Sequence, residues 1–185
     1  MIVYHFCTSI NEANAYILID PETKQALLID VPEWTPMMEQ VLVEQQAQLK
    51  GVFITHEHYD HISGLQKLRQ RYNGLKQYPE KDFFHNTNMN KTATLKLGDY
   101  EGQIISLPGH TPESVGLYID GIIFTGDALF AGSVGGTISS LQAKQQIEAI
   151  KTKILTLPEN TLIFPGHGPI TLVSTEKKYN PFLQP

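Results

Sequence analysis

The sequence predicts an α/β protein built in layers, with largely mixed sheets. Two observations predict this class: strands joined by turns dominate the early part of the chain, and strands alternate with helices in the later part. The apolar runs in both parts are short and bounded by turn residues, which is typical of strands. The 185 residues contain no internal repeat and no linker-like stretch. We therefore expect one domain over residues 1–185, large enough to bury a core.

The first strands and the first helix are marked by their flanking residues. Three apolar runs predict strands, the last two joined by a turn that contains Pro21: Met1–Cys7, Asn14–Ile19 and Gln25–Ile29. Thr35 suits the N-cap of a helix and Pro36 its first position. Apolar residues then recur at roughly the helical period, so we expect this helix to continue to Gln48.

The later elements follow from the same signals. Asp120-Gly121 predicts a two-residue hairpin between neighbouring strands. The stretch Ser139–Leu157 is the clearest amphipathic helix. The residues expected on its buried side are Leu141, Ile147, Ile150, Ile154 and Leu155. The remaining predicted strands are Gly51–Thr55, Gln103–Leu107, Val115–Ile119, Ile122–Thr125 and Thr161–Phe164, and the remaining helices run from His61 to about Tyr72 and from Leu172 to Tyr179.

Composition excludes several classes of protein. The formal net charge is −5 and the 14 Lys and Arg residues are scattered, so there is no electrostatic reason to expect a nucleic-acid partner. The single cysteine, Cys7, excludes an internal disulfide and a multi-cysteine zinc site, and suits a reducing compartment. The sequence shows neither a signal peptide nor an apolar run that could span a membrane. We therefore expect a cytoplasmic protein; the sequence indicates no oligomeric state.

Residues 55 to 64, THEHYDHISG, hold three of the seven histidines and follow an apolar run. In an extended segment the side chains of His56 and His58 point the same way, whereas Glu57 points the opposite way. Asp60 and His61 follow as the chain turns into a helix, and they can face a second position nearby. Neutral imidazole and carboxylate groups are ligands for zinc and iron. This segment therefore predicts ligands for two adjacent metal ions.

Three further candidate ligands also follow apolar runs. QIISLPG leads to His110, IIFTG to Asp127 and LIFPG to His167. A lone histidine at a strand end is more often a hydrogen-bonded core or loop residue than a ligand. The cluster is different, because sites in layered α/β proteins gather where strand ends meet loops. We therefore expect these side chains to complete a metal site begun by the histidine-rich segment.

These residues lie in motifs that resemble those of the metallo-β-lactamase-fold hydrolases: THEHYDH, PGHTPES, FTGDALFAGSVGGT and FPGHGP. Within that group the sequence is most similar to glyoxalase II (hydroxyacylglutathione hydrolase) and its short relatives. The resemblance implies a four-layered αβ/βα sandwich with a dinuclear site. It assigns one ion to His56, His58 and His110, and the other to Asp60, His61 and His167, with Asp127 bridging both. It also implies that Asp30 orients a ligand histidine.

The resemblance implies hydrolysis of a small-molecule thioester or ester. Two divalent ions, zinc by default with iron or manganese as alternatives, supply a hydroxide at neutral pH, and the catalytic side chains are Asp60 and Asp127. No serine or cysteine nucleophile is required, and we expect Cys7 to be a small core residue. A thiolate leaving group needs little acid assistance. A cysteine replaces the residue corresponding to Asp127 in β-lactamases of the commonest sort, which argues against that activity.

Three departures bear on the substrate. Only 17 residues follow Gly168, so we expect the C-terminal helical domain with which full-length glyoxalase II enzymes bind glutathione to be missing. Family members commonly have Gly-Arg-Thr-Asp where this chain has Gly135-Gly136-Thr137-Ile138. Glu113 replaces a usual glycine, and a solvated turn residue is the simpler interpretation of it. Together these departures weaken the case for glutathione as the carrier thiol.

The main alternative is a persulfide dioxygenase with one iron, bound by His56, His110 and Asp127. A second is a hydrolase of lactones or other esters, and a third is a binding or sensor protein that holds metal without turnover. RNA-processing relatives need substrate-clamping segments for which this acidic chain has no place. Flavodiiron-type oxidoreductases have Glu where this chain has His58. The surroundings of His167 favour the hydrolase.

Overall fold

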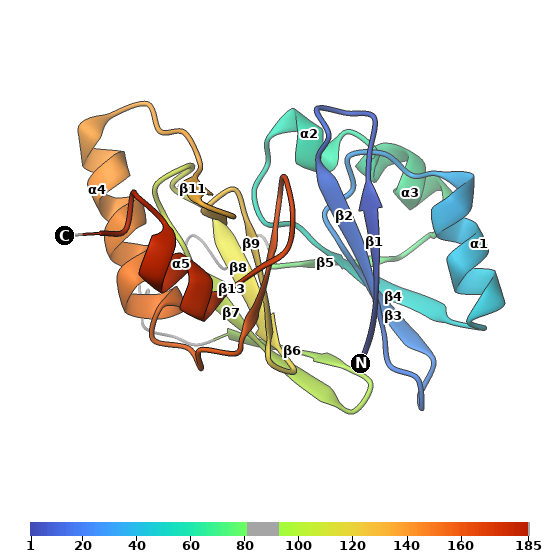
Figure 1. The fold of residues 1–185 in the computed structure, drawn as a ribbon. Helices are drawn as coiled ribbons and strands as arrows, with labels where there is room; N and C mark the ends of the chain where they lie inside the picture. Colours follow the sequence, from blue (N-terminus) through green and yellow to red (C-terminus); the bar gives the residue numbers. More distant parts are fainter. Residues whose placement is uncertain (81–92, 185) are drawn as a thin grey trace. The chain divides into compact units, whose positions relative to one another are not determined.

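The computed structural model describes residues 1–80 and 93–184 (Figure 1). By its internal contacts the chain divides into two compact units, one of Met1–Thr87 with Thr94–Gly102 and one of Asn88–Ala93 with Gln103–Pro185. Each unit contains a sheet and helices, and the two sheets are mixed, so the predicted α/β class with mixed sheets is confirmed. The expectation of a single domain stays a prediction.

The sheet of the first unit has the strand order β1-β2-β3-β4-β5. Its strands are β1 (Ile2–Cys7), β2 (Asn14–Ile19), β3 (Gln25–Ile29), β4 (Gln48–Phe53) and β5 (Lys76–Tyr78). The first three pair antiparallel, as adjacent strands joined by turns do, whereas β4 is parallel to both β3 and β5. The parallel pairs bring the carboxyl ends of β3 and β4 to the same edge of the sheet.

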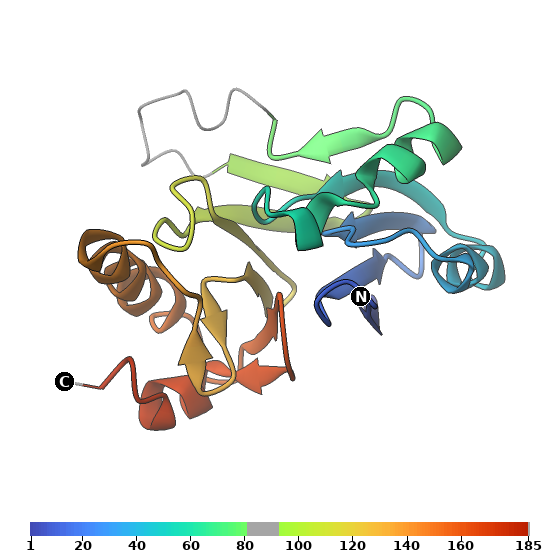
Figure 2. The ribbon, with the colours of Figure 1, turned by 90° about the horizontal axis from the view of Figure 1, so that it is seen from above.

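Three helices accompany this sheet: α1 (Pro36–Glu44), α2 (Tyr59–Ile62) and α3 (Leu65–Arg71). Met38 and Leu42 of α1 and Leu68 of α3 pack into one apolar cluster with strand residues such as Ile17 and Leu28. Figures 1 and 2 show α1 and α3 beside the strands of this unit. The helices bury one face of β2, which carries Ala15, Ile17 and Ile19 of the same cluster.

Two predicted helices of this unit have different bounds. The predicted N-cap is confirmed, since the Thr35 hydroxyl accepts a hydrogen bond from Met38 N. The helix ends at Glu44 instead of Gln48, because Gln46 takes a left-handed backbone conformation (φ 53°) and the chain then enters β4. The second predicted helix is split into α2 and α3.

The split in the second helix has a local cause. Gly64 N donates to the carbonyl of Val31, and the hydroxyl of Ser63 donates to the carbonyl of Pro32. Both bonds draw the chain toward the segment that follows β3. A further correction concerns Cys7, which is exposed at the end of an edge strand and is not a core residue.

The second sheet has the order β13-β12-β9-β8-β7-β6. Its strands are β6 (Ala93–Leu97), β7 (Tyr100–Ser106), β8 (Val115–Ile119), β9 (Ile122–Gly126), β12 (Leu162–Pro165) and β13 (Thr171–Leu172). The chain passes from the first unit to the second within β7, and β6 belongs to the first unit. The predicted hairpin at Asp120-Gly121 is confirmed by the antiparallel pairing of β8 and β9, while β12 is parallel to β9.

Helices α4 (Ser140–Ala149) and α5 (Val173–Tyr179) pack on this sheet, and a π-helical turn, Ile150–Ile154, extends α4. Ile150 and Ile154 join β9 and β12 residues in one core cluster, as predicted. Leu141, expected on the buried side, is instead 66% exposed at the first turn of the helix. The short hairpin of β10 (Leu129–Phe130) and β11 (Ser133–Val134) was not predicted, nor were β6 and β13. None of the helices in the described ranges has the length and apolar character needed to cross a membrane.

Candidate metal centre

The predicted ligands fall into two groups, one in each unit. The first, called here the segment group, contains His56, His58, Asp60 and His61, all of which follow β4. The second, called the strand-end group, contains His110, Asp127 and His167, each of which follows a different strand of the second sheet.

The segment group is anchored by Asp30, which follows β3. Because β3 and β4 run parallel with Ile29 opposite Phe53, Asp30 lies beside the residues that follow β4, and its N–H donates to the Phe53 carbonyl at 2.8 Å. Its backbone is left-handed (φ 52°), a conformation that Asp tolerates better than most residues. The parallel register therefore places a buried carboxylate directly beneath the histidine-rich segment.

The Asp30 carboxylate accepts three hydrogen bonds. Thr55 donates through its backbone N–H (2.8 Å) and its hydroxyl (2.7 Å), and His61 donates through Nδ1 at 2.7 Å. Asp30 and His61 are 2% and 0% exposed. Because Nδ1 of a neutral His61 is the protonated nitrogen, its lone pair is on Nε2, the arrangement of a metal-ligating histidine backed by a carboxylate. Asp30 thus holds a histidine as the resemblance implied.

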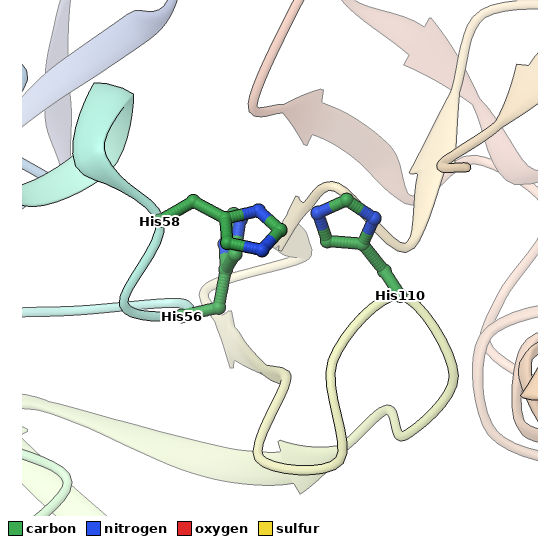
Figure 3. A group of neighbouring side chains, drawn as sticks. All are labelled: His56, His58 and His110. Carbon is green, nitrogen blue, oxygen red and sulfur yellow. The ribbon is translucent and has the colours of Figure 1, made fainter. Parts of the chain in front are cut away.

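His56 and His58 present nitrogen atoms to each other. The Nε2 of His56 lies 3.0 Å from the Nδ1 of His58, and the two rings meet edge to face (Figure 3). On its other side His56 Nδ1 contacts the Thr55 hydroxyl at 3.1 Å, and that hydroxyl already donates to Asp30. His56 must therefore donate from Nδ1, which leaves the lone pair on Nε2. Two nitrogen ligands at about 2.0 Å from one tetrahedral ion are roughly 3.3 Å apart, so the observed spacing fits a shared ion.

Asp60, at the start of α2, is held from the loop between β1 and β2. Asn11 Nδ2 donates to Asp60 Oδ2 at 3.1 Å. This loop has left-handed backbones at Asn11 (φ 51°) and Glu12 (φ 55°), and Ser9 N donates to Glu33 Oε1 at 2.8 Å. Ligand atoms of Asp60 and His61 lie within 4.8 Å of each other, as do those of His56 and His61. The extended segment and the following helical turn thus bring all four ligands into one cluster.

Tyr16 of β2 lies near this cluster but is not a base. Its ring is 2% exposed and stacks on His5, with ring centres 5.0 Å apart. Burial raises its pKa far above the usual value, and the negative charge of Asp30 raises it further, although a hydrogen bond with Asn14 opposes both. The phenol therefore stays protonated at physiological pH. His5, for its part, pairs through Nε2 with Asn14 Oδ1 at 2.7 Å.

The strand-end group is positioned by sheet register. In the parallel pair of β9 and β12, Gly126 lies opposite Pro165, and Gly166 N donates to the Gly126 carbonyl at 2.8 Å. Asp127 and His167 therefore leave the sheet at the same edge. Strand β7 is antiparallel to β8 and β8 to β9, so β7 also ends at this edge and leads to His110. The expected convergence of three strand ends is present within this unit.

The geometry of the strand-end group resembles that of ligands around a cation. The Nε2 atoms of His110 and His167 lie 3.5 Å and 3.6 Å from Asp127 Oδ2. These distances are long for hydrogen bonds but close to the roughly 3.4 Å expected between nitrogen and oxygen ligands of one ion. His110 donates from Nδ1 to the carbonyl of Gly136 at 2.7 Å, which leaves the lone pair on Nε2. Both ligand groups therefore fit a divalent metal by donor type and by proton position.

The hairpin of β10 and β11 adjoins this group. The ring of Phe130 meets the ring of His167 edge-on at 5.9 Å. The buried carboxylate of Glu176, on α5, accepts hydrogen bonds from Gly132 N at the hairpin turn (2.9 Å), from the Thr171 hydroxyl (2.6 Å) and from Asn180 Nδ2 (2.8 Å). Glu176 therefore joins the hairpin to the segment that follows His167.

Sequence reasoning predicted the seven candidate ligands and Asp30, but it missed the other side chains that hold the segments bearing these candidates. Asn11 donates to the side chain of Asp60, Gln146 binds the segments that follow Asp127 and precede Gly136, and Glu176 binds the hairpin turn and Thr171. A buried amide or carboxylate on an otherwise apolar helix face is a usable signal for Gln146 and Glu176. The sequence pattern gives no such signal for Asn11, which is exposed in a turn.

Fold and ligand groups together define a metal-binding α/β protein. The comparisons with known proteins agree: residues 10–88 match the Metallo-beta-lactamase superfamily. The chain is 30% identical to the probable metallo-hydrolase YqgX of Bacillus subtilis, over 93% of this chain and 92% of that protein. It is 31% identical to the hydroxyacylglutathione hydrolase GloC of Haemophilus influenzae, over 93% of each. The crystal structure of the BLEG-1 B3 metallo-beta-lactamase superposes with a TM-score of 0.87 at 25% identity, over the whole of both chains.

The chain belongs to the metallo-beta-lactamase superfamily. The match to a structure of that fold confirms the predicted fold class, and the curated relatives confirm the resemblance to the glyoxalase II group. The relatives are hydrolases, or probable hydrolases, by name. The superfamily and the two His/Asp groups make this protein a member of a metallo-hydrolase family with side chains able to bind metal ions.

Proposed function

We propose that the segment group and the strand-end group together bind two divalent metal ions, zinc by default, and that the protein hydrolyses a small acyl thioester or ester. His56, His58 and His110 would hold one ion, and Asp60, His61 and His167 the other, with Asp127 shared. When bound, such ions supply hydroxide at neutral pH and polarise a carbonyl group. The observation that carries the proposal is that both groups fix histidine N–H groups on protein acceptors and so direct lone pairs to the ligand side.

The chain's own residues have defined tasks in this proposal. Asp30 and the Gly136 carbonyl set the tautomers of His61 and His110, so these rings need not reorient or lose a proton on binding metal. Asp60 and Asp127 contribute negative charge that offsets the charge of two cations. Because Tyr16 stays protonated, it does not serve as the general base of the site.

The thioester assignment is supported by the relative named hydroxyacylglutathione hydrolase, which matches over nearly its whole length. Thiolate is a good leaving group, so its expulsion needs no strong general acid.

The test is thiol release from S-lactoylglutathione by zinc-reconstituted protein. We expect release that is lost in His58→Ala and kept in Glu57→Gln, an exposed neighbour that points away in an extended segment. No release from metal-loaded wild type would contradict the thioester assignment. Oxygen consumption with glutathione persulfide by iron-loaded protein would then favour the mononuclear dioxygenase. Turnover of lactones or other esters would instead favour a lactone or ester hydrolase.

A further inference from the structure

We propose that Gln146, a buried residue of α4, is a positioning residue for His110 and Asp127. The proposal rests on the metal-binding role given to these two side chains in the proposed function. Gln146 is 1% exposed and lies in the second unit, as do both ligands. It touches neither ligand side chain through its amide, and acts through the loops that bear them.

The Gln146 amide joins two loop segments of the strand-end group. Its Nε2 donates to the carbonyl of Ala128 at 2.9 Å and to the carbonyl of Gly135 at 3.1 Å. Ala128 follows Asp127, and Gly135 precedes Gly136, whose carbonyl accepts the Nδ1 proton of His110. Since both partners are acceptors, only the NH₂ group can face them, and this fixes the orientation of the amide.

A third loop segment packs on the same residue. Gly109, directly before His110, has φ 147°, and a Cβ there would approach the Cα of Gln146 to 2.7 Å. Gly135 is equally constrained, because its Cβ would overlap the carbonyl oxygen of Asp127. The segments before His110, after Asp127 and before Gly136 therefore meet at one side chain. The two glycines let the three segments approach Gln146 closely, and its amide binds two of them.

An apolar residue at position 146 would satisfy packing alone. The neighbouring buried positions of α4 and the following turn, Ala149 and Ile150, belong to the apolar core of this unit. Burying an amide there has a free-energy cost, and Gln146 Oε1 has no hydrogen-bond partner among the described residues. The two bonds from Nε2 offset that cost. The buried amide is thus explained by the loops it binds, and these loops contain two proposed metal ligands.

The experiment compares four proteins. Gln146→Met keeps the length of the side chain but removes both donors. Gln145→Met makes the same change at the exposed neighbouring position, and Ile154→Val provides a modest core destabilisation in the same unit. Gln146→Leu replaces Gln146→Met should the latter fail to fold. Zinc affinity is measured by competition with a chromophoric chelator, and amide hydrogen exchange of residues 127–137 is measured without metal.

We expect Gln146→Met to bind zinc roughly 10- to 100-fold more weakly and to exchange faster across residues 127–137. Gln145→Met and Ile154→Val should retain wild-type affinity and wild-type exchange in this segment. Wild-type affinity and exchange in Gln146→Met would show that Gln146 only packs, and would overturn the proposal. Wild type that binds no zinc would refute the proposed function instead, while the exchange data would still decide whether Gln146 holds the loops.

Discussion

The segment group and the strand-end group reach similar local geometry by different routes. Four ligands of the first group come from six consecutive positions, His56 to His61, and they are held by the buried Asp30 carboxylate and by Asn11, which binds Asp60. The three ligands of the second group come from three strands and are separated by as many as 57 positions, from His110 to His167. Their supports are a backbone carbonyl, a helix amide and a helix carboxylate.

This difference shows how the ligand side chains are held in position in each group. A contiguous segment needs few supporting side chains, because covalent geometry and the extended-to-helical turn already fix the spacing between its ligands. Ligands on separate strands depend on sheet register and on side chains that hold the loops beyond the strand ends. We therefore expect the strand-end group to be the more sensitive of the two to changes away from its ligands.

The largest effect is expected from removing His167, a ligand in the proposed dinuclear site but not in the mononuclear alternative. His167→Ala should lower thioester turnover by at least roughly 100-fold, more than the loss of a supporting residue usually costs. His56→Ala should be equally inactive, since His56 is a ligand in both schemes. Steady-state thiol release measures both. Wild-type turnover in His167→Ala would show that hydrolysis does not require His167, and would favour a single-metal site.

The second largest effect is expected from changing Asp30, the buried carboxylate that holds the segment group. Asp30→Asn replaces one carboxylate oxygen by an NH₂ group, which cannot accept the bonds from Thr55 and His61. We expect about 1–3 kcal/mol lower free energy of unfolding and roughly 10- to 100-fold weaker zinc binding. Urea denaturation and chelator competition measure the two losses. Unchanged zinc affinity would show that Asp30 serves the fold alone.

The helix carboxylate of the second unit has a smaller expected effect on metal binding. Glu176→Gln loses acceptor capacity toward Gly132, Thr171 and Asn180, so the free energy of unfolding should fall by about 1–3 kcal/mol. Glu159→Gln is the matched control, because Glu159 is exposed and pairs only with Lys177 at the surface; its effect should stay within about 0.5 kcal/mol. Equal urea midpoints for the two variants would refute the bracing role of Glu176.

The contrast between the groups also explains what the sequence could predict. The candidate ligands of the segment group could be predicted because they are adjacent and such residue types rarely occur together. Those of the strand-end group could be predicted only because three apolar runs each lead to a side chain that can bind metal. Gln146 and Glu176 were not predicted, because they bind loops whose positions the strand patterns do not encode. Helix bounds failed where tertiary bonds decided them, as at Gly64, whose N–H is bound by the Val31 carbonyl.

The smallest effect concerns a second carboxylate of the first unit that lies outside the ligand groups. Asp20 accepts bonds from Asp99 N, the Thr23 hydroxyl and Glu22 N, which lower its pKa from 3.8 to about 2. A lowered folded pKa stabilises the fold above pH 3.8, and this contribution is lost as pH falls toward 2. The stability gap between wild type and Asp20→Asn should therefore narrow over that range. Urea midpoints measured against pH would contradict this if the gap stayed constant.

The most direct test of the central claim is the number of metal ions bound per protein chain, with and without a ligand from each group. Equilibrium dialysis against zinc, followed by elemental analysis, should give about two ions per chain for wild type and about one for both His58→Ala and His167→Ala. This result would show that ligands of both groups are needed to bind the full pair of ions. One ion per wild-type chain, unchanged in His167→Ala, would contradict a dinuclear site composed of both groups.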